Sequence, residues 1–401
     1  MVSLEPPGSH RNSGNAGAET GFLDRLISLR RELHRHPELS EQEERTAGLI
    51  CSFLEDLGIS HRAGVGGYGV VAQVDGRNSG PVVALRADID ALPIGEETGL
   101  PFASATDDVM HACGHDGHTA MLMGAAILLR ERPPPNPVRL LFQPAEERGT
   151  GARRMIAEEA IEGVSAIFGG HLDVNHPVGA LVVTEGVVNS ASDYFTIYIK
   201  GKMGHGARPH EAVDAVVVGS SLVSALQTVV SREVNPADPA VLTVGSFNAG
   251  SAENVIAGSA ILTGTIRTLD PEVRRHLCDS VVRMATAAGR LYGCGVDTEV
   301  REGNPPVINA PAMTELARRA AVEVVGRTNV LRMRTPNMGS EDFGRYLERI
   351  PGCYIRYGGL TAGSDPSPAH SSRFDFDERA LAVGARWLDT VARLAAQELA
   401  R

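Results

Sequence analysis

An alternation of extended and helical patterns runs through the first half of the chain, and this feature constrains the fold most. Runs rich in branched apolar residues predict strands at residues 69–75, 81–88, 138–142 and 164–168. Helical apolar spacing predicts helices at 117–130 and 152–160, between these strands. Strands that alternate with helices are typical of an α/β layer with a mostly parallel sheet, because each helix returns the chain to the same edge.

The pattern changes after residue 189. The predicted elements then follow the order β-α-β-β-α-β, which is typical of a ferredoxin-like α+β domain. Beyond residue 301 the helical and apolar runs of the first half return. We therefore expect a flexible tail at 1–20, a main domain in two parts at 21–189 and 302–401, and a domain at 190–301 inserted into it.

The composition argues against several classes of protein. With 401 residues, 43% apolar and 22% charged, the chain is long enough for two globular cores. A net charge of −11 argues against nucleic acid as a partner, because phosphates require a basic face. There is no apolar run of membrane-spanning length, no signal-peptide pattern at residues 1–20, and no paired spacing among the five cysteines. We expect a cytoplasmic protein that does not bind a membrane.

Polar clusters follow three of the predicted strands, and a fourth cluster opens a helix. They are Asp88–Asp90, Gln143–Glu147, Gly169–His171 and His111–His118. Because the carboxyl ends of parallel strands meet at one edge of a sheet, we expect these clusters to converge. Each cluster alone has an ordinary structural interpretation, as a solvated acidic pair, a turn or a buried histidine. Convergence favours a shared functional site.

Two of the clusters have the chemistry of a metal site. Cys113 and His115 stand two residues apart in a turn with glycine, and a thiolate with an imidazole suits a metal such as zinc. Glu146 and Glu147 are adjacent, so one can bind a metal while the other takes a proton from a metal-bound water.

Two aspartates are interpreted as supports for that site. Asp90 and Asp116 can accept hydrogen bonds from metal-binding imidazoles and orient them, although each could instead cap a helix or stabilise a turn. His118, one helical turn after His115, is expected to pack or to bond to the backbone.

Nine ordered motifs resemble one known family over the chain from about Leu23 to near its C-terminus. The motifs are RADIDALPI, MHACGHDGHTAMLMGAA, LLFQPAEE, AIFGGH, GKMGHGARPH, AENVI, GTIRTLD, NMGSEDF and AHSSRFDFDE. This order and spacing resemble the aminoacylase/carboxypeptidase metallopeptidase family. The resemblance is greatest to the branch of hippurate hydrolases, indole-acetyl-amino-acid amidohydrolases and N-acetyl-diaminopimelate deacetylases.

The resemblance implies a catalytic domain like that of dinuclear-metal exopeptidases, with the inserted ferredoxin-like domain as a lid that also forms a homodimer. It implies two divalent metal ions per chain, zinc first, with manganese, cobalt or nickel as alternatives. It implies the metal ligands Cys113, His115, Glu147, His171 and His370. It also implies Glu146 as general base, and His205, Asn254 and Arg267 as residues that face the substrate.

The function that these features predict is metal-dependent hydrolysis of the amide bond in N-acyl amino acids or small conjugates. A dipeptidase or carboxypeptidase, or a hydrolase of an aromatic amine, would need the same site and stays open. A non-catalytic metal or peptide binding protein would not need Glu146, and a thiol-redox enzyme would need a second cysteine near Cys113.

A few positions depart from the family pattern. Arg148, Gly170, Arg208 and Ser372 stand where relatives commonly have other residue types. The two arginines either favour an acidic substrate side chain or lie on the surface.

Overall fold

A computed structural model describes residues 13–401 of the chain. Its contacts divide the chain into two compact units, which are described separately. The first unit comprises the chain up to Val183, Glu315–Leu331 and Ile355–Arg401. The second comprises Thr184–Thr314 and Arg332–Tyr354.

The first unit contains an eight-stranded sheet in the order β1-β2-β4-β3-β5-β16-β6-β15. Its strands are β1 (Ser60–Val65), β2 (Gly69–Val74), β3 (Val82–Asp88), β4 (Val138–Gln143), β5 (Val164–Pro177), β6 (Leu181–Val182), β15 (Val330–Leu331) and β16 (Gly352–Leu360). The centre is parallel, since β3 pairs with β4 on one side and β5 on the other, whereas β1, β2 and β4 pair antiparallel. The predicted α/β class is therefore confirmed as a mixed sheet with a parallel centre.

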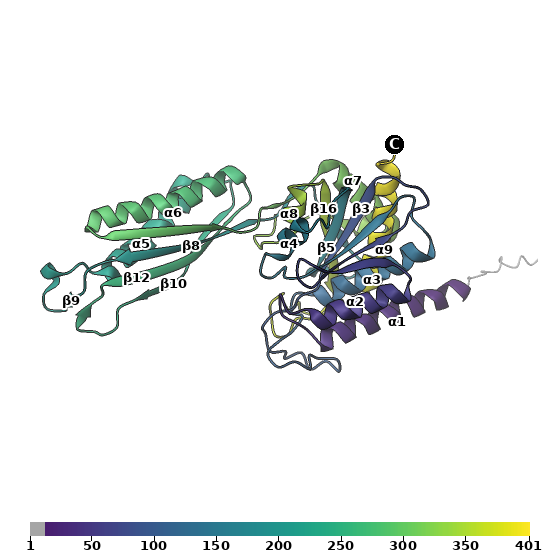
Figure 1. Ribbon diagram of the computed structural model, residues 1–401, viewed down its shortest axis with the longest axis horizontal. Helices are drawn as coiled ribbons and strands as arrows, with labels where there is room; N and C mark the ends of the chain where they lie inside the picture. The colour runs from purple at the N-terminus through teal and green to yellow at the C-terminus, as the bar shows by residue number, and fades with distance from the viewer. Residues whose placement is uncertain (1–12) are drawn as a thin grey trace, which may run out of the picture. The chain divides into compact units, whose positions relative to one another are not determined.

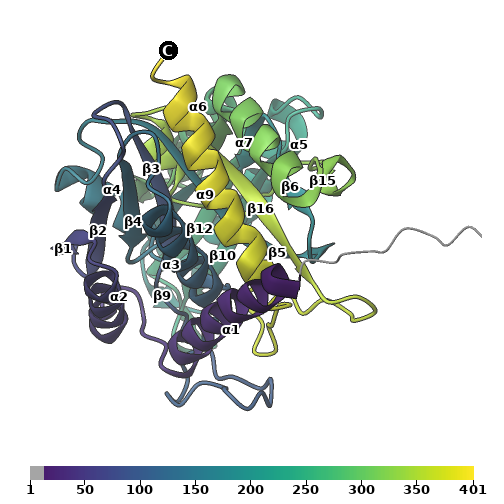
Figure 2. The ribbon, with the colours of Figure 1, turned by 90° about the vertical axis from the view of Figure 1, so that its right-hand side faces the viewer.

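Helices pack against this sheet, and three of them lie side by side. α3 (His115–Glu131) contacts α9 (Ala380–Glu398) along its length, and α1 (Ser13–Arg35) lies beside both (Figure 2). The first unit also contains α2 (Glu44–Asp56), α4 (Gly151–Ala157) and most of α7 (Pro311–Val325), whereas α8 (Gly344–Leu347) belongs to the second unit. α1 begins at Ser13, within the segment expected to be a tail, and residues 1–12 of that tail lie outside the described residues.

The second unit contains a four-stranded antiparallel sheet in the order β10-β12-β8-β13. Its elements follow one another as β8 (Ala191–Lys200), α5 (Ala215–Glu233), β10 (Ala240–Ala249), β12 (Ser259–Thr268), α6 (Pro271–Tyr292) and β13 (Gly295–Glu302). Phe195, Ile197 and Ile199 of β8 share one buried cluster with residues of both helices. α5 and α6 therefore cover the same face of the sheet (Figure 1).

Smaller elements complete the second unit. They are β7 (Gly186–Asn189), β9 (Gly204–His205), η1 (Pro209–Glu211), β11 (Val255–Ile256) and β14 (Val307–Asn309), with the short helix η2 (Arg327–Asn329) in the first unit. β9 pairs with β11, and β7 pairs with β14.

Among the described residues, only α5 is long and apolar enough to match the length and composition of a membrane span. Leu222, Leu226 and Val229 of this helix belong to the buried cluster of the four-stranded sheet. A core helix of a soluble domain passes the same test, so α5 is explained by its packing.

Candidate metal centre

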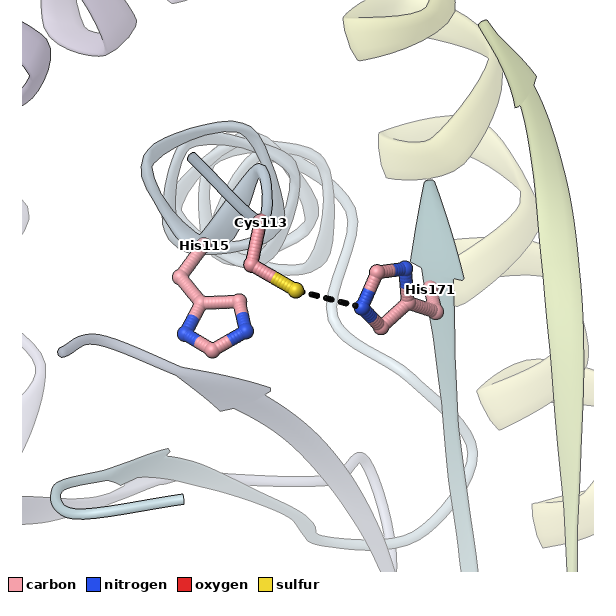
Figure 3. A group of neighbouring side chains, drawn as sticks. All are labelled: Cys113, His115 and His171. Carbon is pink, nitrogen blue, oxygen red and sulfur yellow. Dashed lines mark hydrogen bonds between the residues drawn. The ribbon is translucent and has the colours of Figure 1, made fainter. Parts of the chain in front are cut away.

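The turn before α3 brings Cys113 and His115 to one place. Gly114, between them, has a φ of +85°, a left-handed conformation that glycine adopts without strain. The side chain of Cys113 points toward β5, where its Sγ lies 3.2 Å from the Nε2 of His171 (Figure 3). Cys113 and His115 are buried, with 8% and 1% of their surface exposed, so their side chains have little contact with solvent.

Glu147 and His370 join the same group. The Oε1 of Glu147 lies 3.5 Å from the Nε2 of His370 and 3.9 Å from the Nε2 of His115. Ligand atoms of the expected residues lie within 4.8 Å of one another in three overlapping groups, namely Cys113–His115–His171, Cys113–Glu147–His370 and His115–Glu146–Glu147. The structure thus brings together all five residues that the resemblance implies as ligands, with Glu146 next to them.

Unpaired atoms in this group indicate that a cation fits. Among the described residues, the buried Nε2 of His115 and Oε1 of Glu147 have no hydrogen-bond partner. The other nitrogen of His115 lies 2.9 Å from the backbone oxygen of Asp90, and Nδ1 of His171 lies 2.6 Å from the backbone oxygen of Leu172. Each ring therefore has one nitrogen fixed and the other directed at the group, as in histidines that bind metals.

The charges at this position also favour a cation. Burial, followed by the negative charge of Glu147, raises the pKa of the Cys113 thiol to about 12. Burial opposes a charge on His115, but the negative charge of Asp88 is the largest of the effects that outweigh it and raise its pKa. Thiol, imidazole and carboxylate together form a ligand set for zinc or a similar divalent ion, which would stabilise the thiolate.

Asp88 contacts the candidate metal centre, although the sequence alone suggested no role for it beyond membership of a polar cluster. Its Oδ1 accepts a 2.6 Å hydrogen bond from Nδ1 of His118, and its Oδ2 accepts one of 2.6 Å from Arg86. The Nε2 of His118 accepts the backbone N–H of Leu172, so both nitrogens of this ring are engaged and His118 supports the site. The signal was present, because Asp88 and Asp90 are two residues apart and such residues of an extended chain share one side.

Asp90 and Asp116 lie in different surroundings. Asp90 contacts His115 Nδ1 through its backbone oxygen and, at 3.2 Å, through its Oδ1. Asp116 differs from the expectation, since its Oδ2 accepts hydrogen bonds of 2.8 Å from both Arg30 and His34 of α1. Successive helical residues point about 100° apart, so Asp116 is turned away from the direction of His115 and toward α1.

The second unit holds the three residues expected to face the substrate, at two different places. His205 lies in β9 opposite Val255 of β11, and the oxygen of Asn254 accepts the N–H of Gly206, so His205 and Asn254 are neighbours. Both side chains are exposed. Arg267 pairs with Ser192 at the other end of β12.

Three of the departures from the family pattern have local explanations. Arg148 is exposed and lies 3.5 Å from Glu41, and Arg208 is exposed and lies 3.9 Å from Glu211, which are surface ion pairs. At Gly170 a Cβ atom would come within 2.8 Å of the Tyr357 ring, so a larger residue would displace that ring.

The sequence pattern of peptidase family M20/M25/M40 matches residues 84–394. The chain belongs to this family. It is 42% identical over 358 residues to the N-acetyl-L-cysteine deacetylase of Bacillus subtilis, covering 89% of this chain and 84% of the relative. It is 37% identical over 378 residues to the IAA-amino acid hydrolase ILR1-like 5 of Arabidopsis thaliana, covering 92% and 86%.

A solved structure agrees with the fold. The crystal structure of the YXEP protein of Bacillus subtilis, a dinuclear metal binding peptidase from the M20 family, superposes with a TM-score of 0.83 at 37% identity. The match covers 94% of this chain and 99% of that one. Family membership and the candidate metal centre together identify the protein as a metal-dependent hydrolase of amide bonds.

Proposed function

We propose that the enzyme hydrolyses the amide bond of N-acyl amino acids, with Glu146 as general base and two divalent ions held by Cys113, His115, Glu147, His171 and His370. The observation that carries this proposal is the convergence of the expected ligand atoms around Glu147, two of them buried without a hydrogen-bond partner, with Glu146 beside them. Bound divalent ions would polarise the substrate carbonyl and acidify the attacking water. The names of the two relatives, an N-acetylated and an amino-acid-conjugated substrate hydrolase, support the substrate class.

Glu146 then moves the proton. Its carboxylate takes a proton from the attacking water and delivers it to the departing amine, which is the role of a general base that then acts as a general acid. The same sequence of transfers would cleave a dipeptide or an aromatic amide, and the choice among these substrates depends on the groups that hold the two ends of the molecule.

The separation of Arg267 from His205 supports a homodimer. Ser259 and Arg267 lie near the two ends of β12. At ~3.3 Å per residue, these two residues are roughly 26 Å apart along the strand. β9 and β11, which carry and flank His205, adjoin the Ser259 end. An extended N-acyl amino acid is only ~7 Å long, so one small substrate does not span both residues of one chain. We propose that Arg267 binds the substrate carboxylate in its own chain, and that His205 and Asn254 serve the partner's site.

The surface of α5 and β10 supports dimerisation through the domain at 190–301. From Ala215 to Ser231 helix α5 has no charged residue, and Val216 and Val217 are 41% and 50% exposed. β10 has no charged residue either, and it is an edge strand of its sheet. Edges of this kind normally carry charge unless another chain pairs with them. We propose that a second copy covers this surface and that the domain also acts as a lid.

Metal analysis and a substrate panel test the function. The purified enzyme should contain up to two divalent ions per chain and should lose activity reversibly on chelation. N-acetyl, N-benzoyl and N-indoleacetyl amino acids should be cleaved faster than a dipeptide or an aromatic amide. Full activity of the metal-free protein would contradict the mechanism, and preference for the dipeptide would contradict the substrate class.

The cytoplasm is the proposed compartment. All five cysteines are free, which suits a reducing environment.

A further inference from the structure

The loop that carries Glu146 has an unusual backbone. Ala145, directly before it, has a φ of +51°, a left-handed conformation that is strained for a residue with a Cβ atom. The backbone oxygen of Ala145 accepts the N–H groups of Thr150 and Gly151, which closes the loop. Such a conformation persists only where surrounding contacts impose it.

Two buried carboxylates hold the peptide groups on either side of Glu146. The N–H of Ala145 donates to Oε1 of Glu43 at 2.9 Å, and the N–H of Glu147 donates to Oδ2 of Asp90 at 3.0 Å. Asp90 is in turn held by the hydroxyl of Ser40 at 2.7 Å. The segment between α1 and α2 therefore supplies one side chain, Glu43, directly to the loop and one, Ser40, through Asp90.

Glu43 does not cap the helix that follows it. Its side chain makes no capping hydrogen bond to α2, because Glu38 accepts the N–H groups of Arg45 and Thr46 at the start of that helix. Glu43 is fully buried, and its Oε2 has no hydrogen-bond partner among the described residues. Burial raises the pKa of this carboxyl to about 7. Burying a carboxyl group is costly, and the N–H of Ala145 is the contact that offsets this cost most, ahead of the backbone N–H groups of Glu43 and Glu41.

We propose that Glu43 is a positioning residue that fixes the direction of the Glu146 side chain by holding the strained peptide of Ala145. The inference rests on the proposed role of Glu146 as base. A base that is misplaced by about 1 Å loses on the order of 10²-fold in rate, even when binding is unchanged. Loss of the acceptor at Glu43 should therefore lower kcat and leave KM and metal content almost unaltered.

Three substitutions distinguish the effect of the hydrogen-bond acceptor at Glu43 from the effects of its charge and its size. Glu43→Gln keeps an oxygen at the same reach, Glu43→Asp keeps the charge but shortens the reach, and Glu43→Met keeps the length without an oxygen. We expect kcat within ~3-fold of wild type for Gln, ~10-fold lower for Asp, and ~10- to 100-fold lower for Met. Glu38→Met is the control. It makes the same substitution at a neighbouring glutamate whose side chain caps α2 and makes no hydrogen bond to the loop of Glu146. It should lower the melting temperature without lowering kcat.

Hydrogen exchange of the 143–151 segment gives a readout that does not need activity. Glu43→Met should expose the amide of Ala145, and Glu43→Gln and Glu38→Met should leave it protected. If wild-type enzyme cleaved no substrate of the panel, the proposed function would fail while the exchange data still tested the contact. Wild-type kcat in Glu43→Met, or equal losses of kcat in Glu43→Met and Glu38→Met, would overturn the inference. If Glu43→Met does not fold, the kcat values of the other two variants test the inference. A higher kcat for Glu43→Gln than for Glu43→Asp would support it, and the reverse order would overturn it.

Discussion

At the scale of single residues, two adjacent glutamates should give different phenotypes. Glu147 contacts His370 and His115, whereas Glu146 lies beside this group as the proposed base. Glu146→Gln should keep the fold and the metal while kcat falls roughly 10²- to 10⁴-fold, the usual contribution of a general base. Glu147→Gln should instead lose bound metal. Elemental analysis and kinetics of both variants check this assignment, and opposite results would mean that the two roles are exchanged.

The buried His34 should make stability depend on pH. Burial opposes its charge, but Asp116 at 2.8 Å and Glu96 at 3.3 Å outweigh that effect and the repulsion of Arg30, and they raise its pKa to about 9. A raised pKa means that the folded state binds this proton more tightly. The stabilisation is complete below the unfolded pKa of ~6.5 and is lost as pH rises through about 9.

Unfolding experiments between pH 6 and 10 measure this effect. The wild-type protein should lose on the order of 3 kcal/mol across that window from His34 alone. His34→Gln should be less stable at pH 6 and should show a smaller loss on the way to pH 10. Parallel curves for the two proteins would show that His34 is not protonated at neutral pH.

The residue types at the strand ends could be predicted from the sequence, but their partners could not. The three clusters after strands and the cluster that opens a helix were predicted to converge, and Cys113 and Glu147 do meet, because parallel strands place their carboxyl ends together. The pairing of Asp116 with α1 and of Glu43 with Ala145 depends on how helices pack against each other. A single sequence does not encode that packing as a local pattern, so both contacts were missed.

At the scale of elements, helix α6 offers a test of capping. Oδ1 of Asp270 accepts the N–H groups of Glu272 at 2.7 Å and Val273 at 3.0 Å. Asp270→Ala should reduce the free energy of unfolding by about 1 kcal/mol, the usual value of such a cap. Asp279→Ala, an exposed change inside the same helix, is the control and should be neutral or slightly stabilising. Chemical denaturation of both variants measures these free energies of unfolding, and equal changes in the two variants would argue against a cap at Asp270.

Elements with a strong periodic pattern were predicted, and short or irregular ones were not. The predicted strands at 69–75, 81–88 and 138–142 correspond to β2, β3 and β4. β1 was missed because most of its side chains are exposed, so its sequence lacks apolar alternation. β5 continues to Pro177 rather than ending at Phe168, so His171 lies within the strand and not after it. Its glycines and polar residues carry no strand signal, and neighbouring strands impose the extended conformation.

At the scale of the whole molecule, complementation between chains tests whether His205 acts on the substrate of the partner chain or on that of its own chain. Inactive Glu146→Gln chains are mixed with inactive His205→Ala chains. If His205 acts on the partner's substrate, each hybrid dimer has one intact site, and random exchange should restore about a quarter of wild-type activity. Differently tagged chains confirm that exchange has occurred. Exchange without recovered activity would mean that His205 serves its own chain or has no catalytic role.

Cys113 and His370 meet around Glu147 although most of the chain lies between them. During synthesis Cys113, His115 and Glu147 leave the ribosome early, and the sheet formed by β8, β10, β12 and β13 is complete before His370 is made. The candidate metal centre therefore cannot be complete before His370 has been made, by which point the sheet of the second unit is already whole. A nascent chain that stops short of His370 would keep that sheet but would lack one of the five expected metal ligands, so it should hold metal less tightly than the full chain.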